Sequence, residues 1–130
     1  MIILDASGVV PLLLDPPATT EELQARLRGV SAIHAPHLLD VEVAHALRRL
    51  VLGGGISAAR ACRAIRRLSV LPLVRWPHDR LLGRTLALRD QLTAYDATYV
   101  ALAEALGATL LTRDARMAKA GGHQARVEVV

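Results

Sequence analysis

Acidic residues follow apolar segments at several points of the 130-residue chain, and their positions suggest a shared site. Asp5 directly follows the apolar run 2–4, and Asp114 stands close behind the apolar run 108–111. Because the carboxyl ends of parallel strands meet at one edge of a sheet, we expect both side chains at that edge. Asp96 stands at the start of a predicted helix, which could face the same edge. Carboxylates that converge in this way can bind Mg²⁺ or Mn²⁺ and support hydrolysis of a phosphodiester bond.

Each of these acids also has a purely structural explanation. Asp5 could cap the helix that follows it, because an Asp side chain accepts a hydrogen bond from a free N–H of the first turn. Asp96 and Asp114 both open helices, where the helix dipole favours a negative charge. In the long predicted helix 36–52, Glu42 and Asp40 lie at opposite margins of the apolar face. The residues by themselves do not choose between these two.

Hydroxyl and basic residues near the acids could support such a site. Ser7 lies near Asp5 and Thr112 lies before Asp114, so either hydroxyl could hydrogen-bond a carboxylate and orient it. Basic residues near the acids in sequence could hold a substrate phosphate or be surface charges: Arg89, Arg113, Arg116 and Lys119. A second basic set projects from one predicted helix and could bind RNA phosphates or only face solvent: Arg60, Arg63, Arg66 and Arg67.

The histidines, the glycines and the single cysteine give no support to a zinc site, a phosphate-binding loop or a cysteine nucleophile. The five histidines are scattered and form no compact zinc motif such as H-E-x-x-H. The glycines 53–55 are not followed by the Lys-Ser/Thr pair of a phosphate-binding loop. Cys62 lies on the apolar stripe of a predicted helix, so we expect it in the core rather than as a nucleophile. As the single cysteine, it also forms no internal disulfide and no multi-cysteine zinc site within one chain.

Alternating strands and helices must position these residues. Strands are predicted at residues 2–4, 30–35, 70–74, 108–111 and 127–130. Helices are predicted at residues 7–14, from 20, from 36 to 52, from 57, from 77, from 96 to 106 and briefly after 114. Pro16 and Pro17 are expected to stop the first helix, Ser57 to cap the fourth and Gly107 to end the sixth. The alternation predicts an α/β sandwich around a mostly parallel sheet.

The composition fits one domain over residues 1–130, with 52% hydrophobic and 22% charged residues. A net charge of +4 favours an anionic partner such as nucleic acid. With one Trp, two Tyr and no Phe, we expect recognition through backbone charge and shape more than through stacked bases. No apolar run approaches the length of a membrane span and the start lacks a secretory signal, so we expect a soluble, cytoplasmic protein.

Four segments of the chain resemble the motifs of PIN-domain proteins, and specifically of VapC-type toxins from bacterial and archaeal toxin–antitoxin pairs. They are Ile3-Leu4-Asp5-Ala6-Ser7, Leu39-Asp40-Val41-Glu42-Val43-Ala44, residues 92–103 and Leu111-Thr112-Arg113-Asp114. Their order and spacing match the family across nearly the whole chain, and Thr93-Ala94-Tyr95-Asp96-Ala97 is the most specific part. The resemblance implies a three-layer α/β/α sandwich with a central, mostly parallel sheet.

The same resemblance implies a magnesium- or manganese-dependent endoribonuclease. By position, the acidic quartet of the family would be Asp5, Glu42, Asp96 and Asp114. This favours Glu42 over Asp40. Thr112 matches the hydroxyl residue before the last acid, and Arg89 falls where related toxins often carry an arginine. In the implied mechanism the three aspartates hold the metal, and Glu42 completes its shell and orients or deprotonates the attacking water.

Family members commonly form homodimers and are inhibited by a cognate VapB-type antitoxin, whose tail occupies the metal site. The resemblance therefore implies RNA and such an antitoxin as partners. Two other functions stay open from the sequence. One is a non-catalytic PIN-like module that binds RNA or protein, and the other is a structure-specific DNA nuclease that uses the same acids.

Overall fold

A central sheet of five parallel strands organises the structure. The computed structural model describes residues 1–14 and 17–130. The strands lie in the order β3-β2-β1-β4-β5, and every neighbouring pair is parallel. They are β1 (Ile2–Leu4), β2 (Ile33–Pro36), β3 (Leu73–Trp76), β4 (Thr109–Thr112) and β5 (Arg126–Val129). All five therefore deliver the residues that follow them to the same edge of the sheet.

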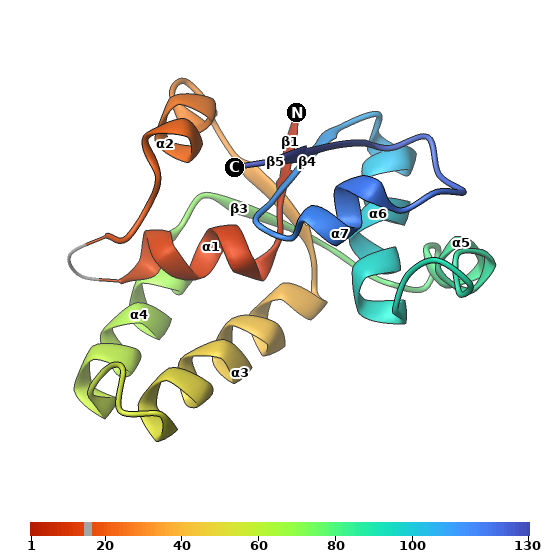
Figure 1. The fold of residues 1–130 in the computed structure, drawn as a ribbon. Helices are drawn as coiled ribbons and strands as arrows, with labels where there is room; N and C mark the ends of the chain where they lie inside the picture. Colours follow the sequence, from red (N-terminus) through yellow and green to blue (C-terminus); the bar gives the residue numbers. More distant parts are fainter. Residues whose placement is uncertain (15–16) are drawn as a thin grey trace.

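Helices cover both faces of this sheet (Figure 1). They are α1 (Ala6–Leu13), α2 (Glu21–Leu27), α3 (Leu38–Leu52), α4 (Ala58–Val70), α5 (Leu82–Ala87), α6 (Ala94–Leu106) and α7 (Ala115–Lys119). On one face α1 packs against α3 and α4, and on the other α6 packs against α5 and over β2, β4 and β5. The layers confirm the predicted α/β/α sandwich with a parallel sheet.

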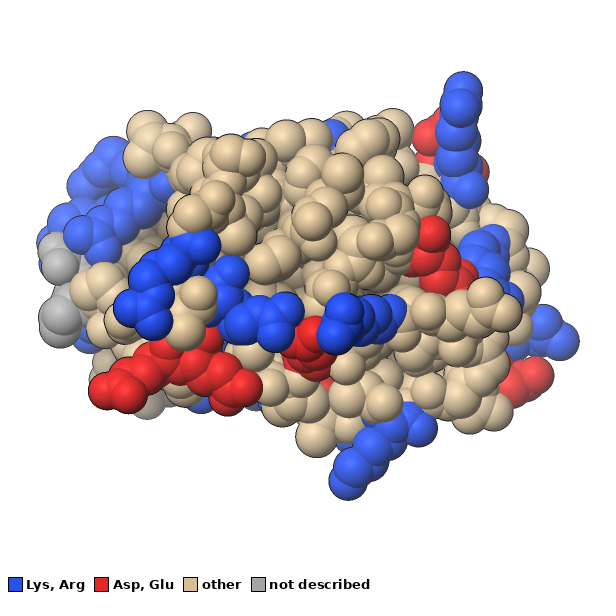
Figure 2. Space-filling model, turned by 90° about the horizontal axis from the view of Figure 1, so that it is seen from above, with Lys and Arg blue, Asp and Glu red and all other residues tan. Residues whose placement is uncertain are grey.

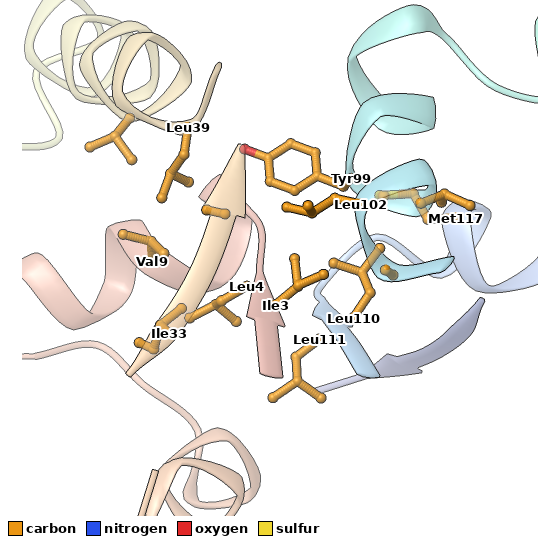
Figure 3. Packing of buried hydrophobic residues seen from close by; sticks show 14 of the residues in the cluster. Ile3, Leu4, Val9, Ile33, Leu39, Tyr99, Leu102, Leu110, Leu111 and Met117 are labelled. Carbon is orange, nitrogen blue, oxygen red and sulfur yellow. The ribbon is translucent and has the colours of Figure 1, made fainter. Parts of the chain in front are cut away.

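The two central strands carry the most deeply buried residues (Figure 3). Ile3 and Leu4 of β1 are fully buried, and successive residues of a strand point to opposite faces of the sheet. Leu4 meets α1 so closely that a Cβ on Gly8 would lie 2.4 Å from Leu4 Cδ1. This close approach fixes the start of α1, and with it Asp5, directly at the end of β1.

Capping residues set several helix boundaries as the sequence predicted. Thr20 accepts a hydrogen bond from the N–H of Leu23 at the start of α2, and Ser57 accepts one from Arg60 at the start of α4. Gly107 ends α6 with a φ of 59°, the left-handed conformation that glycine adopts without a steric penalty.

The predicted start of the long helix is wrong, because its first residues belong to the sheet. Pro36 ends β2, where it pairs with Trp76 of β3. The helix begins at Leu38 instead, and His78 Nε2 accepts a hydrogen bond from the N–H of Leu38. A contact 40 residues away in sequence thus decides this boundary.

Other boundaries also differ from the predicted ones. β3 begins at Leu73 rather than at residue 70, because α4 continues through Val70. The helix expected from residue 77 is the six-residue α5. The first helix ends at Leu13, and Pro16, one of the two prolines expected to stop it, lies outside the described residues. Within the described residues, no helix has both the length and the hydropathy that crossing a bilayer requires.

Cys62 is exposed, so its predicted place in the core is wrong. Ala64 and Leu68 are the residues of α4 that turn into the core. Ile65, an apolar residue of the same helix, is 40% exposed. Cys62 and Ile65 instead line an open groove between α3 and α4. The buried stripe of this helix is therefore narrower than its apolar residues suggest.

Candidate active site

Segments far apart in the sequence bring the predicted acids to the carboxyl edge of the sheet. Asp5 follows β1 and caps α1, and Asp114 follows β4 and caps α7. Glu42 lies in α3, which starts just after β2, and Asp96 lies in the first turn of α6. The parallel sheet thus explains why residues separated by up to about a hundred positions share one end of the molecule.

Asp5 is the most buried of these acids, with 7% of its surface exposed. Its Oδ1 accepts hydrogen bonds from Ser7 Oγ at 2.6 Å and from the N–H of Gly8 at 3.1 Å. Its Oδ2 accepts one from Thr112 Oγ1 at 2.6 Å. Burial nevertheless raises the pKa of Asp5, because desolvation outweighs the hydrogen bonds that lower it. The carboxylate is held in one orientation but lacks full electrostatic compensation.

Ser7 and Thr112 join the loops that carry Asp5 and Asp114. Ser7 Oγ donates to Asp5 and accepts a hydrogen bond from the N–H of Arg113 at 2.8 Å. Thr112 Oγ1 donates to Asp5 and accepts one from the N–H of Asp114 at 2.9 Å. The two hydroxyls therefore make the hydrogen bonds to Asp5 that the sequence suggested, and they also fix the loop after β4.

Glu42 is held by a residue that the sequence reasoning missed. The hydroxyl of Tyr99, in the buried middle of α6, donates a hydrogen bond to Glu42 Oε2. Burial raises the pKa of Glu42, and the negative charges of Asp5 and Asp96 raise it further. One signal could have pointed to Tyr99. A tyrosine in the middle of an otherwise apolar buried helix needs a partner for its hydroxyl.

Asp40, the alternative to Glu42, belongs to a different contact. Its two carboxylate oxygens accept hydrogen bonds from Arg75 Nε at 2.7 Å and from an Arg75 terminal nitrogen at 2.9 Å. The charges of Asp5 and Asp96 act on Glu42, and they raise its pKa.

Asp96 combines a structural contact with its place in the cluster. Thr93 caps α6 by accepting a hydrogen bond from the N–H of Asp96 at 3.2 Å, and its Oγ1 donates to Asp96 Oδ2 at 2.9 Å. The capping explanation is therefore correct in part. It does not exclude a further role, because the charge of Asp96 reaches Glu42.

Asp114 stands apart from the other three because it is paired. It accepts hydrogen bonds from the N–H of Arg116 at 2.8 Å and from the Arg116 guanidinium at 2.6–3.1 Å. These contacts lower the pKa of Asp114. The Arg116 side chain is 89% exposed, and the charge of Asp96 also acts on it. Arg116 thus lies at the open side of the cluster, between two of its acids.

The donor chemistry of this cluster fits a hard divalent cation. Its side chains offer carboxylate oxygens, the ligands that Mg²⁺ and Mn²⁺ prefer. Within residues 1–14 and 17–130, Asp5 and Glu42 have no Lys or Arg partner, so a bound cation would relieve their mutual repulsion. In the same part of the chain, no three His, Cys, Asp or Glu side chains are gathered closely enough to hold an ion as they stand. Asp114 would have to leave Arg116 to join the other acids.

The predicted phosphate-binding arginines have different surroundings. Arg113 and Arg116 flank Asp114, whereas Arg89 donates to the carbonyl of Leu86. Arg67 does not belong with the solvent-facing arginines of its helix. It donates to the carbonyls of Leu13 and Leu14, where α1 ends and free carbonyls need a donor.

Comparisons with known proteins agree with this architecture. The PIN domain family matches residues 2–123. Two proteins of Mycobacterium tuberculosis are similar over almost the whole chain. Ribonuclease VapC1 is 45% identical over 129 residues, covering 98% of this chain and 96% of that protein. Ribonuclease VapC12 is 42% identical over 130 residues, covering 100% and 99%.

Among solved structures, VapBC2 from Rickettsia felis, bound to a DNA fragment from its promoter, superposes with a TM-score of 0.71. The match covers 99% of this chain and 98% of that one at 13% identity, so it shows a common fold. The fold and the full-length sequence similarity lead to one conclusion: the chain belongs to the PIN-domain family, among its VapC-type members.

Proposed function

We propose that this protein is a metal-dependent endoribonuclease, the toxin of a VapBC-type toxin–antitoxin pair. The observation that carries the proposal is the cluster of Asp5, Glu42 and Asp96 at the carboxyl edge of the sheet. Burial raises the pKa of both Asp5 and Glu42, and the charges of Asp5 and Asp96 raise that of Glu42 further. The described residues provide no Lys or Arg partner to balance either carboxylate. A fold seldom keeps such an arrangement without a function, since buried uncompensated carboxylates are costly. The VapC relatives carry the name ribonuclease, which supports RNA as the substrate.

Asp5, Glu42, Asp96 and Asp114 are the residues that would hold the metal, Mg²⁺ or Mn²⁺. When bound, such an ion polarises a water molecule and neutralises the charge that develops on the phosphate. Ser7 and Thr112 keep Asp5 in one orientation, so its carboxylate needs little reorganisation when the ion arrives. To hold the ion, Asp114 would have to leave the exposed Arg116, and the side chains of the other three acids would have to move closer together.

Glu42 is the residue best suited to take a proton from water. Its Oε2 accepts the hydrogen bond from Tyr99, which leaves Oε1 free for a water molecule. Its raised pKa also brings the carboxylate closer to neutral pH, where a general base works most efficiently. Arg113 and Arg116, which flank Asp114 in sequence, would contact the phosphate.

A cleavage assay with matched variants tests the proposal. Total RNA should be cut in Mg²⁺ or Mn²⁺ and left intact in EDTA. Asp5→Asn and Asp96→Asn should abolish cutting, whereas Asp90→Asn, a change at an exposed acid outside the cluster, should not. Cutting by the wild type in EDTA, or full activity of Asp5→Asn, would refute the proposal. Binding of RNA without cutting would favour a binding module, and preferential cutting of DNA would favour a DNA nuclease.

The protein partner we propose is a VapB-type antitoxin. The structural relative from Rickettsia felis is a VapBC complex, and its VapC-type fold covers almost all of this chain. Coexpression with the product of a small neighbouring gene should yield a complex that is inactive on RNA. Homodimer formation, also proposed for this chain, can be measured by light scattering on the same samples.

A further inference from the structure

A cavity of about 490 Å³ opens beside Glu42, between the start of α3 and the first turn of α6. Its lining includes Glu42, His45, Arg49 and Tyr95. Cavities of this size accept ligands as large as a nucleotide. Because Glu42 belongs to both, the cavity adjoins the carboxylate cluster directly.

Tyr95 places an exposed aromatic ring at the cavity beside Glu42. It is 62% exposed, although it is the residue before Asp96 in α6. The other tyrosine, Tyr99, is buried against Glu42, and the single tryptophan, Trp76, stacks on His34 within the sheet. Of the three Tyr and Trp side chains in the chain, Tyr95 is the one that presents an exposed ring beside the acid cluster.

The cavity continues into a second one of about 610 Å³ on the side of α1. The two share Ala6, Ala46 and Arg49 in their linings, and the second extends past Ser7 to Arg113. We call this continuous depression the α1–α3 groove. Glu42 lines one part of the groove and Ser7 lines another, so the groove runs alongside the acid cluster.

Two cations of the α1–α3 groove are available to an anionic ligand. Within the part of the chain that the structure describes, the guanidinium groups of Arg49 and Arg113 have no acidic partner. Other arginines, such as Arg75 and Arg84, are paired with acids and so partly neutralised. Unpaired arginines beside an acidic cluster fit a ligand that carries its own negative charges, such as a phosphate backbone.

The opposite end of the molecule is less suited to a nucleic acid. Figure 2 shows the end at which β1 begins, with basic side chains in separate groups and several of them beside acidic residues. Arg26 and Arg126 also contact an acid, since both pair with Glu128 of the edge strand β5. Among the described residues, two unpaired arginines, the exposed ring of Tyr95 and an acid of the cluster come together at the α1–α3 groove.

We propose that the α1–α3 groove binds a single-stranded stretch of RNA, with an unpaired base stacked on Tyr95 and adjacent phosphates on Arg49 and Arg113. The proposal rests on the ribonuclease function proposed above and assigns the side chains that would hold the RNA beside the acids. In a duplex the bases stack on one another and cannot reach the ring face, whereas a loop or free strand offers them. The scissile phosphate would then lie next to Glu42.

Binding in EDTA tests the groove without cleavage. The probe is a short, fluorescein-labelled, random-sequence single-stranded RNA, compared with an RNA duplex of the same length, and binding is followed by anisotropy. Tyr95→Ala should weaken binding of the single strand roughly 5- to 150-fold and leave duplex binding nearly unchanged. Tyr95→Phe keeps the ring and should bind within about 3-fold of the wild type, which separates stacking from a hydrogen bond of the hydroxyl. Circular dichroism checks that both variants are folded.

The arginines have a matched pair in α3. Arg49→Gln should weaken binding and reduce the slope of log affinity against log salt by about 0.7. Arg48→Gln removes the same charge one residue away, outside the α1–α3 groove, and should change the slope far less. Equal slopes for the two variants would overturn the assignment of Arg49 to a phosphate.

Three further outcomes would overturn the proposal: an unchanged affinity of Tyr95→Ala for single-stranded RNA, an equal loss on duplex, or a loss of affinity only for a protein partner. The last would make the α1–α3 groove a protein-docking surface. Failure of this inference is distinct from failure of the proposed function. If the wild type cuts RNA with metal but Tyr95→Ala binds single-stranded RNA as well as the wild type does, only the groove assignment is wrong. If the wild type does not cut RNA but Tyr95→Ala loses binding of the single strand, only the ribonuclease function is wrong.

Discussion

Thr112→Val is the sharpest test of how the structure builds the acid cluster. Thr112 is fully buried, and its hydroxyl donates to Asp5 Oδ2 and accepts from the N–H of Asp114. Valine has nearly the same shape, so the change removes both hydrogen bonds without opening a cavity. It leaves Asp5 short of one donor and the Asp114 N–H short of an acceptor.

The expected magnitude follows from these two contacts. A hydrogen bond to a charged group contributes about 1.5–3 kcal/mol, and a buried polar group left unpaired costs about 1–3 kcal/mol. Because Asp114 is only half-buried, water can reach its N–H and reduce the second contribution. We therefore expect Thr112→Val to lower the free energy of unfolding by about 2–4 kcal/mol. It should also raise the pKa of Asp5 further, since one of the hydrogen bonds that lower it is gone.

Urea unfolding at neutral pH in EDTA measures the unfolding free energy. Titration with Mn²⁺ measures metal affinity, and an RNA cleavage assay measures activity. Loss of a residue that orients a metal ligand typically costs about 10- to 100-fold in metal affinity or activity. Thr109→Val is the control, because Thr109 lies at the opposite end of β4 from Thr112. The unfolding free energy of this variant should change by no more than about 0.5 kcal/mol. If both variants unfold at the same urea concentration and cleave RNA equally, the described role of Thr112 is wrong.

Three other predictions follow from the site and its surroundings. Glu42→Gln should increase the unfolding free energy in EDTA at neutral pH. The raised pKa of Glu42 means that folding favours its protonated form. The stability that protonation contributes is present below the ordinary pKa of 4.5 and is lost as pH rises through the raised pKa, so a permanently neutral Gln is favoured at neutral pH. The gain should vanish in urea titrations below pH 4.5, and a gain that persists there would contradict the assignment. Arg116→Gln should change stability by less than about 1 kcal/mol, because its pair with Asp114 is exposed, yet tighten Mn²⁺ binding in calorimetry, since the guanidinium no longer competes for that carboxylate. Cys62 should react with a thiol reagent in the folded protein as fast as in urea, and Cys62→Ser should be neutral in stability; protection of the thiol would place it in the core after all.

The sequence alone determined the layered α/β fold and the edge at which the acids lie. Short apolar runs that end in an acid, such as residues 2–5, specify both a buried strand and the position of the side chain that follows it. Local capping signals were also readable, because a Ser, Thr or Gly at a helix end acts on atoms within a few residues. The boundary between Pro36 and α3 was not readable, since the hydrogen bond from Leu38 to His78 spans 40 positions.

The tertiary structure decided how the acids differ from one another. The residues by themselves leave Glu42 and Asp40 as alternatives, and it is the family resemblance that favours Glu42. Folding separates the two by their contacts, because it brings Arg75 to Asp40 and Tyr99 to Glu42. It likewise leaves Asp5 buried and without a cation while Asp114 is paired with Arg116. Burial, desolvation and the charge of neighbours depend on contacts between distant segments, so no spacing rule along the chain could predict them. The sequence thus located the carboxylates at one edge, and the packing of α3, α6 and β4 determined which of them are buried and which are paired with an arginine.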